Sequence, residues 1–288
     1  MYPPLPKSNI QLADGRTLSY AEYGRPNGTP VFLFHGTPGS RLMGRMGHNA
    51  AADRNVRLIA PDRPGFGRST FQRARTILNW TEDVVQLAAS LEIERFAVLG
   101  VSGGGPYAAA CAMKIPERLT AAGIVSGIAP LRKSTLRGMS RINRSQLLMA
   151  RRLPPLFRAQ WAVLNLLGQR YPERMLSGTT KAAPDREILA RDEVRDSFIA
   201  DMHEAMATGS HGVAHEMGLF AKPWGFRLED ITMPVKLWHG ESDRTVPVAM
   251  GRYQATAIAN CTATFIPDAG HLWIVDNFGT VLSSLVQT

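Results

Sequence analysis

The stretch that decides the fold reads Leu99-Gly100-Val101-Ser102-Gly103-Gly104-Gly105-Pro106-Tyr107. A short apolar run, 96–99, leads into it, and a run of small residues, 108–112, follows it. The spacing G-x-S-x-G between a predicted strand and a predicted helix is typical of a nucleophile elbow, a strained turn that lifts a serine above the edge of a sheet. Glycines at positions 100 and 104 would leave room where a Cβ would collide with neighbouring backbone.

A glycine-rich turn can also hold a phosphate, so the two uses have to be distinguished. No lysine follows the glycines in the Walker pattern, and the G-x-G-x-x-G spacing of dinucleotide-binding turns is absent. The predicted helix after the turn directs its free N–H groups toward Ser102, where they favour developing negative charge. The pattern therefore predicts that Ser102 is a nucleophile.

Short apolar runs alternate with helical patterns over much of the chain. An opening hairpin is predicted from 10–12 and 17–21, and a helix over 81–91 with Thr81 as its N-cap. Runs that are apolar on both faces indicate an α/β fold with a mostly parallel central sheet and helices on both faces. The predicted sheet strands are 31–34, 56–60, 96–99, 121–125, 235–238 and 262–266.

The alternation of strands and helices breaks near Pro130. Residues 131–225 are helical in character, rich in Arg, Met and Leu, and contain no strand-like run. Strand patterns resume at Val235. We therefore expect an α/β core domain built from residues 1–130 and 226–288, with a helical cap of residues 131–225 inserted between its two parts.

A serine hydroxyl needs a base to remove its proton. After an elbow of this type, the acid and then the histidine follow the serine along the chain. Asp243 comes shortly after the run 235–238, and His271 comes shortly after the run 262–266. Both therefore belong to loops at the edge of the sheet where open α/β folds bind ligands. We predict that His271 is the base and that Asp243 orients it.

Other acids and histidines compete for these roles. Glu241 is an alternative acid, but it lies closer to its strand end than Asp243. Asp268 shares the loop of His271, where a local turn role is expected. His239 ends a strand and is expected to be packed. The remaining candidates are His48, in an early helix, and the cap residues His203, His211 and His215; for the pair His211/His215 a solvated or hydrogen-bonded helix face is expected, because no Glu follows His211 as a zinc peptidase needs.

The first core strand ends in the loop His35-Gly36-Thr37-Pro38-Gly39. Acyl transfer needs two hydrogen-bond donors aimed at the developing oxyanion. The backbone N–H groups of Gly103 and Thr37 are the predicted donors. A plain strand-to-helix turn would also use Gly and Pro, but the position directly after this strand favours the oxyanion role.

Together these motifs resemble the α/β-hydrolase family, in the branch with a serine nucleophile and a His-Gly-x-Pro oxyanion loop that includes esterases and proline iminopeptidases. The resemblance covers nearly the whole chain and also rests on the segment 62–69, which is structural in that family. It implies the α/β-hydrolase fold, an acyl-enzyme mechanism, and neither a metal nor an organic cofactor.

Departures from individual members of the family narrow the expected activity. Haloalkane dehalogenases and epoxide hydrolases place Asp where Ser102 stands. Proline iminopeptidases usually have Gly at the position of Thr37 and hold the substrate amine with acidic cap residues. Glu204 and Glu216 could serve, but residues 131–225 carry 15 Lys/Arg against 9 Asp/Glu. We expect hydrolysis of a carboxylic ester or lactone with an apolar acyl group. An aminopeptidase, a carbon–carbon bond hydrolase, a cofactor-free haloperoxidase and a receptor-like protein with slow turnover remain alternatives.

Four further residues are candidates for contact with a small-molecule substrate. Val101 and Trp273 adjoin the predicted catalytic residues, and Phe157 and Trp161 lie in the predicted cap, which would roof the pocket.

The bulk properties describe an ordinary globular chain. The formal net charge of +9 comes from scattered arginines, so we expect a solvated surface and no nucleic-acid partner. No apolar run is long enough to span a membrane, and the N-terminus does not have the pattern of a signal peptide. Cys111 and Cys261 are expected to be buried free thiols, which suits a cytoplasmic location. The sequence does not indicate an oligomeric state.

Overall fold

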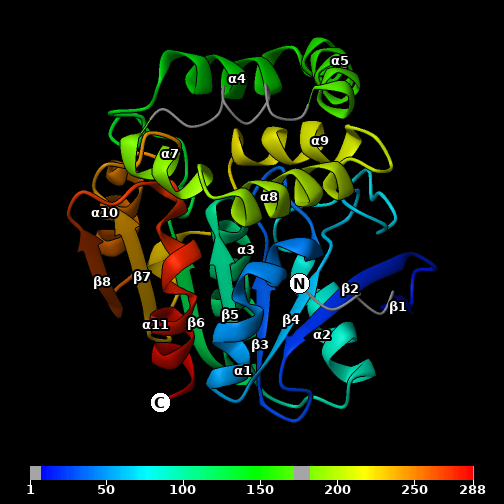
Figure 1. Cartoon of the computed structure of the whole chain (residues 1–288), viewed down its shortest axis with the longest axis vertical. Coiled ribbons are helices and arrows are strands. Elements are labelled where there is room, and N and C mark those ends of the chain that lie inside the picture. Colours follow the sequence, from blue (N-terminus) through cyan, green and yellow to red (C-terminus); the bar gives the residue numbers. More distant parts are fainter. Residues whose placement is uncertain (1–7, 172–181, 288) are drawn as a thin grey trace.

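The computed structural model describes residues 8–171 and 182–287 (Figure 1). Its described strands form one sheet of eight, in the order β1-β2-β4-β3-β5-β6-β7-β8. The strands are β1 Ser8–Gln11, β2 Thr17–Gly24, β3 Thr29–Phe34, β4 Val56–Pro61, β5 Phe96–Val101, β6 Leu119–Val125, β7 Val235–Gly240 and β8 Cys261–Ile266.

Most of the sheet is parallel. The pairs β1/β2 and β2/β4 are antiparallel, and every other pair in the sheet is parallel. The antiparallel pair at the edge is the predicted opening hairpin. Because the remaining strands run the same way, their carboxyl ends, and the loops that follow them, lie along a single edge.

Helices cover both faces of the sheet, and alternate residues of each strand supply the two cores. Phe32 and Phe34 of β3 belong to one cluster of buried residues, while Val31 and Leu33 belong to the other. The first cluster includes side chains of α2 (Trp80–Ser90) and α3 (Gly105–Lys114) and packs against α10 (Val248–Ala257). The second includes side chains of α1 (His48–Asp53) and α11 (Ile274–Val286). This arrangement confirms the predicted α/β fold class.

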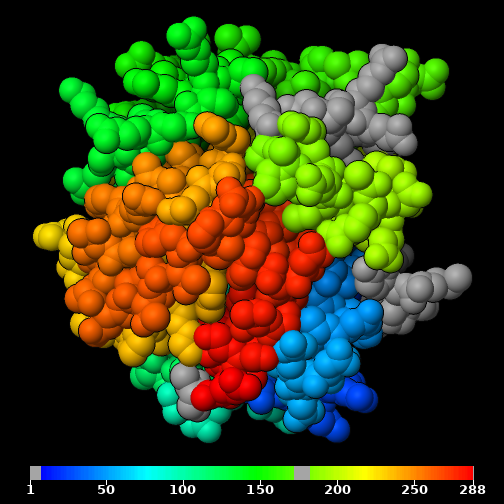
Figure 2. Space-filling model, turned by 60° about the vertical axis from the view of Figure 1, so that its left-hand side comes forward, coloured from blue at the N-terminus to red at the C-terminus, as the bar shows by residue number. Residues whose placement is uncertain are grey.

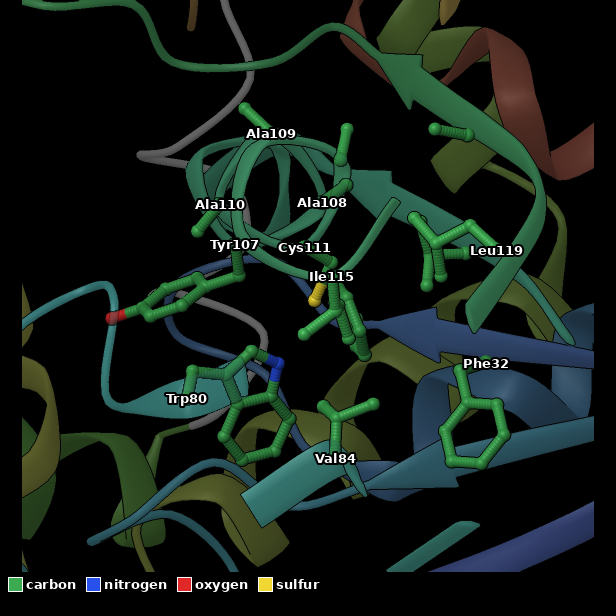
Figure 3. Packing of buried hydrophobic residues seen from close by; sticks show 14 of the residues in the cluster. Phe32, Trp80, Val84, Tyr107, Ala108, Ala109, Ala110, Cys111, Ile115 and Leu119 are labelled. Atoms are coloured by element: carbon green, nitrogen blue, oxygen red, sulfur yellow. The ribbon is translucent and has the colours of Figure 1, made fainter. Parts of the chain in front are cut away.

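The first cluster is centred on the helix that follows the predicted elbow. Figure 3 shows Trp80 and Val84 of α2 beneath Tyr107 of α3, with Phe32 of β3 beside them. The rings of Trp80 and Tyr107 meet edge to face, with their centroids 6.1 Å apart. Close packing on this side fixes the position of α3, and hence of the turn at its start.

Between β6 and β7 the described residues are helical and contain no strand. They form α4 (Arg141–Arg152), α5 (Pro154–Arg170), α7 (Ala183–Leu189), α8 (Asp192–Ala205) and α9 (His211–Phe220), which we call the cap helices. Figure 1 shows them above the sheet, with α4 and α5 outermost. Their inner residues share a cavity with the loops that follow β3, β5 and β7. The exact limits of the cap, 131 and 225, stay a prediction.

Two local predictions are wrong. Thr81 is not the N-cap of α2, because the chain already coils one turn earlier and the hydroxyl of Thr81 donates to the Leu78 carbonyl at 2.8 Å. Cys111 is buried, but Cys261 is only half-buried, because it begins β8, the edge strand of the sheet. Neither thiol is in a disulfide. None of the described helices combines the length and the apolar character needed to cross a bilayer.

Candidate active site

The turn after β5 has the geometry of a nucleophile elbow. Ser102 has φ 55°, a left-handed conformation that costs free energy for any residue except glycine. A Cβ on Gly100 would collide with the backbone of Gly104, and a Cβ on Gly104 would collide with that of Phe34. A short 3-10 turn, Ser102–Gly104, then leads directly into α3. The two glycines therefore let the backbone turn sharply enough to present Ser102 to the cavity.

His271 and Asp243 meet across two loops at the same edge of the sheet. Asp243 follows β7, and His271 begins a short 3-10 helix after β8. The Nδ1 of His271 donates to Oδ2 of Asp243 at 2.7 Å. The other oxygen, Oδ1, accepts from the backbone N–H groups of Thr245 and Val246 at 2.8 and 2.9 Å. The carboxylate is thus fixed from both sides, and the Nε2 of His271 is left to accept a proton.

The pKa values of this pair respond to burial and to each other. Burial by itself raises the pKa of Asp243, but the positive charge and the hydrogen bond of His271 outweigh it and lower that pKa. Burial by itself lowers the pKa of His271, but the charge and the hydrogen bond of Asp243 outweigh it, and the pKa of His271 is raised. Asp243 therefore stays ionised and stabilises an imidazolium at position 271.

The competing acids and the nearest histidine lie elsewhere. Glu241 is exposed and pairs with Arg252 at 2.7 Å. Asp268 is an exposed turn residue with φ 57°. His239 is fully buried and donates from Nε2 to the carbonyl of Val246 at 2.9 Å. The four other candidate histidines do not line the cavity. His48 contacts the backbone N–H of Gly24, and His203 contacts the carbonyl of Gly168. His211 contacts Arg158, and His215 contacts the carbonyl of Arg75.

The structure also brings the two predicted oxyanion donors together. Gly36, Thr37 and Ser102 line the same cavity. A Cβ added to Gly103 would collide with the side chain of Thr37 and would lie 3.2 Å from its backbone nitrogen. The backbone N–H groups of Thr37 and Gly103 are therefore close neighbours beside the serine.

A buried charge network lies behind this loop, and no sequence pattern predicted it. Thr37 donates from its hydroxyl to Glu216 of α9. Arg63 donates one hydrogen bond to each oxygen of the same carboxylate, both at 2.8 Å. Arg75 and the Tyr107 hydroxyl also donate to it, at 3.1 and 2.8 Å. Burial alone raises the pKa of Glu216, but the charge and hydrogen bonds of Arg63 outweigh it, so the pKa is lowered and the carboxylate stays charged.

Arg63 extends the network to the backbone of the oxyanion loop. It donates to the carbonyls of His35 and Gly36 at 2.6 and 3.0 Å. Burial, with the charge of Arg63 adding to it, holds the pKa of His35 well below its ordinary value. Neutral His35 accepts the backbone N–H of Arg63 at Nε2 and contacts the Gly36 carbonyl through Nδ1 at 2.7 Å. The segment 62–69 is expected to have a structural role, and its Arg63 has one here: it holds the loop that carries Thr37.

A second carboxylate from the cap helices supports the histidine loop. Asp185 of α7 is fully buried, and its Oδ1 accepts the backbone N–H of Leu272 at 2.8 Å. Its Oδ2 has no hydrogen-bond partner among the described residues. A Cβ on Gly270 would collide with this carboxylate, so glycine is required for the close approach. Sequence reasoning missed Asp185, because an acidic residue in the first turn of a helix is commonplace.

The cavity itself has a volume of about 390 Å³ and a mainly apolar lining. Among the described lining residues the acidic one is Asp201, which accepts from the backbone N–H and the hydroxyl of Ser40 at 2.9 and 2.6 Å. Burial raises the pKa of Asp201 to about 7. Methionines stand out in the lining: Met43, Met46, Met139, Met202, Met217 and Met250.

Two of the four predicted substrate contacts line this cavity and two do not. Val101 and Trp161 are part of the lining. Phe157 is fully buried behind Trp161, with the ring centroids 6.2 Å apart. Trp273 lies two residues beyond His271 in a helix of three residues per turn, so it points elsewhere and packs against the core. Within the part of the chain that the structure describes, no group of three or more His, Cys, Asp or Glu is placed to hold a metal ion.

Comparisons with known proteins agree with the fold. A family model described as "Alpha/beta hydrolase family" matches residues 31–281. An uncharacterised hydrolase of Bacillus subtilis is 24% identical over 265 residues, which are 91% of this chain and 90% of that protein. A proline iminopeptidase of Xylella fastidiosa is 34% identical over 140 residues, but this match covers only 46% of the chain and 44% of the relative.

A solved esterase from a Rhodococcus species superposes with a TM-score of 0.69 at 20% identity, covering 99% of this chain and 98% of its own. At that identity the likeness shows the fold alone, whereas the family model covers most of the chain and carries a family assignment. The chain belongs to the alpha/beta hydrolase family and is a hydrolase.

Proposed function

We propose that this protein is a serine hydrolase that cleaves a carboxylic ester or lactone with an apolar acyl group, through an acyl-enzyme. The observation that carries the proposal is the placement of Ser102, at a strained elbow, in the same apolar cavity as His271, whose other nitrogen is bonded to Asp243. Neither a metal nor an organic cofactor takes part in the proposed chemistry.

In the proposed reaction Ser102 Oγ attacks the carbonyl carbon while His271 Nε2 takes its proton. The backbone N–H groups of Thr37 and Gly103 bind the resulting oxyanion. Collapse of the intermediate breaks the bond to the leaving alkoxide, which takes the proton from His271 and leaves an acyl group on Ser102. A water molecule then repeats the sequence and releases the carboxylic acid. Asp243 holds His271 in the tautomer that this cycle needs.

The apolar lining favours a neutral acyl group. Methionine side chains are flexible and fill irregular space, so a cavity with six of them suits apolar groups of varied shape. We also propose that residues 131–225 form a cap that roofs this cavity on a core of 1–130 and 226–288. The two unpaired cysteines fit a reducing compartment, and we propose the cytoplasm.

A proline iminopeptidase is the second candidate, because 140 residues match such an enzyme. That activity requires a free carboxylate to hold the substrate amine. Glu216 forms ion pairs with Arg63 and Arg75, and Glu204 forms ion pairs with Arg41 and Arg68. Asp201 is occupied by Ser40. Because all three are engaged, the geometry favours the ester.

The test is a substrate panel given to the purified protein. It contains nitrophenyl esters of increasing acyl length, aliphatic lactones, prolyl nitroanilide, a diketone and a halide-with-peroxide assay. We expect multiple turnovers of the esters or lactones, and little cleavage of the prolyl amide. Faster cleavage of the prolyl amide would assign the iminopeptidase activity, and a single burst without turnover would indicate a receptor-like role.

A further inference from the structure

Among the described residues, most of the exposed large apolar side chains lie on α4 and α5 or at their ends. Both helices pack on α9, so their far sides face away from the body of the protein. Figure 2 shows this segment, in green, forming the top of the molecule. Large apolar side chains that are 40% to 68% exposed lie there: Leu148, Leu153, Leu156, Val163, Leu166 and Leu167. Contiguous exposed apolar surface of this kind marks an interaction site.

The helical spacing shows that α5 has two apolar sides. Its buried side is formed by Phe157, Trp161 and Gly168. A second row is formed by Leu156, Val163 and Leu167, at spacings of seven and four residues, and it lies about a third of a turn from the buried side. A helix that only covered the cavity would have a polar outer side, so the second apolar row needs a partner.

The segment that contains α4 and α5 accounts for the basic excess of the whole chain. Residues 131–171 contain nine Lys/Arg and no Asp/Glu, while the rest of the chain carries 24 residues of each sign. On α4, the exposed Arg144, Arg151 and Arg152 share the outward side with Leu148. Within the described residues, none of these three arginines forms an ion pair. On this positive face, aliphatic side chains therefore alternate with arginines that have no acidic partner among the described residues.

We propose that the outer face of α4 and α5 binds the surface of a membrane that contains anionic lipids. Apolar side chains that enter the acyl boundary, combined with arginines at the level of anionic headgroups, are the two contributions that hold interfacial helices on a bilayer. The face also adjoins the mouth of the cavity, because Ile142 of α4 is 58% exposed and yet lines the cavity.

Two other occupants fit this surface less well. A nucleic acid would pair with the arginines through its phosphates, but Leu and Val offer neither hydrogen bonds nor stacking to bases. A second copy of this chain, docked about a two-fold axis, would place its own arginines against these, and like charges across an interface are costly. An anionic bilayer satisfies both components at once.

The test uses ether-linked phospholipids, which contain no carboxylic ester, so binding is measured independently of any hydrolysis. The purified full chain is sedimented with vesicles of phosphatidylcholine alone or of phosphatidylcholine mixed with phosphatidylglycerol. We expect binding only to the mixed vesicles, weakening as salt rises from low to physiological concentration. No binding to the mixed vesicles at low salt would overturn the proposal.

Two variants and a control locate the surface. The triple change Arg144→Gln, Arg151→Gln, Arg152→Gln should weaken binding at least about tenfold, since each basic residue near an anionic surface contributes substantially. The triple change Leu156→Gln, Val163→Gln, Leu166→Gln should also weaken it, because three of the exposed apolar side chains of α5 are removed while helix propensity is largely kept. Replacing the same three arginines with lysine should retain binding.

The matched control removes three positive charges from the opposite edge of the sheet. Arg25, Arg54 and Arg95 are exposed and stand just before β3, β4 and β5, at the amino ends of the strands. Their change to Gln should leave binding intact. An equal loss in this control would mean attraction by net charge alone, and a stable dimer in sedimentation equilibrium that the Leu156, Val163 and Leu166 changes dissolve would assign the face to a second copy. Either result would contradict the proposal.

Discussion

The loops at the edge of the sheet and the cap helices face one cavity, but they are held in different ways. In the loops, Asp243 has both carboxylate oxygens engaged, and Ser102 is held in a strained turn. The cap helices contribute mainly apolar side chains to the lining, such as Leu147, Met202 and Met217, and these pack without directional bonds. Directional bonds fix atoms to within a fraction of an ångström, whereas apolar packing tolerates changes of shape. The comparison predicts that chemistry depends on the loops and selectivity on the cap helices.

The largest effect should come from Ser102→Ala. Loss of the nucleophile should lower kcat by on the order of 10⁵-fold, while the thermal midpoint stays close to that of the wild type, because Ala fits the elbow. Labelling with a fluorophosphonate probe checks the assignment directly. If the variant is labelled as strongly as the wild type, Ser102 is not the nucleophile.

The second effect separates the two candidate acids. Asp243→Asn should lower kcat by about 10⁴-fold, because Asn cannot stabilise the imidazolium and favours the wrong tautomer. Glu241→Gln, the matched control two residues away, removes only an exposed pair with Arg252 and should change kcat little. The reverse order of the two losses would assign the role to Glu241.

The third effect tests whether a cap helix also reaches the chemistry. The titratable groups that face His271 are Asp243, Asp185 and, behind Asp243, His239, whose pKa is lowered by burial. Because the pKa of His271 is raised, activity that needs its neutral form should fall, as pH is lowered, already above the ordinary pKa of 6.5. Asp185→Asn keeps an oxygen for the Leu272 N–H but removes a negative charge, so this acid limb of kcat/KM should move to lower pH.

Two further variants show whether a shift of the acid limb comes from the charge of Asp185. Asp268→Asn removes an exposed charge from the same loop and should leave the limb in place, because solvent screens it. Asp185→Ala also removes the acceptor for Leu272 and should lower kcat at every pH. If Asp185→Asn lowers kcat uniformly without moving the limb, Asp185 has a structural role only.

The smallest effect per change concerns the cap helices. In a series of soluble, monomeric neutral esters, kcat/KM should rise with acyl length until the cavity is full, by up to about 0.8 kcal/mol per buried methylene. Met217→Ala should reduce this gain for long chains and leave acetyl esters almost unchanged. Salt should have little influence on neutral esters. A strong preference for an anionic ester over its neutral isostere, fading with salt, would instead make the basic residues of the cap a steering surface.

The sequence predicted the fold class and predicted that Ser102, Asp243 and His271 lie at one edge of the sheet, because both predictions depend on local patterns. Strands such as 96–99 are apolar on both faces, and G-x-S-x-G must be a tight turn wherever it occurs. Contacts between segments that are far apart in the chain correspond to no local sequence pattern. Asp185 and Glu216 look like ordinary helical acids until the fold places them against Gly270 and Arg63. The prediction that Phe157 and Trp273 line the substrate cavity is wrong for a related reason. The direction of a side chain depends on its position around its helix, and the neighbours of that helix were unknown.

The position of Glu216 has a consequence for whether the cap helices and the core can be separated. Arg63 and Arg75 belong to the core, but their negative partner lies on α9, and all three side chains are buried. Removing one partner of a buried pair costs about 3–5 kcal/mol, a large part of the stability of a typical domain. A core stripped of its cap helices would lose the acid that pairs with Arg63 and Arg75. We therefore expect the cap helices to unfold together with the core, and a cap transplanted from a relative to need its own acid at this position.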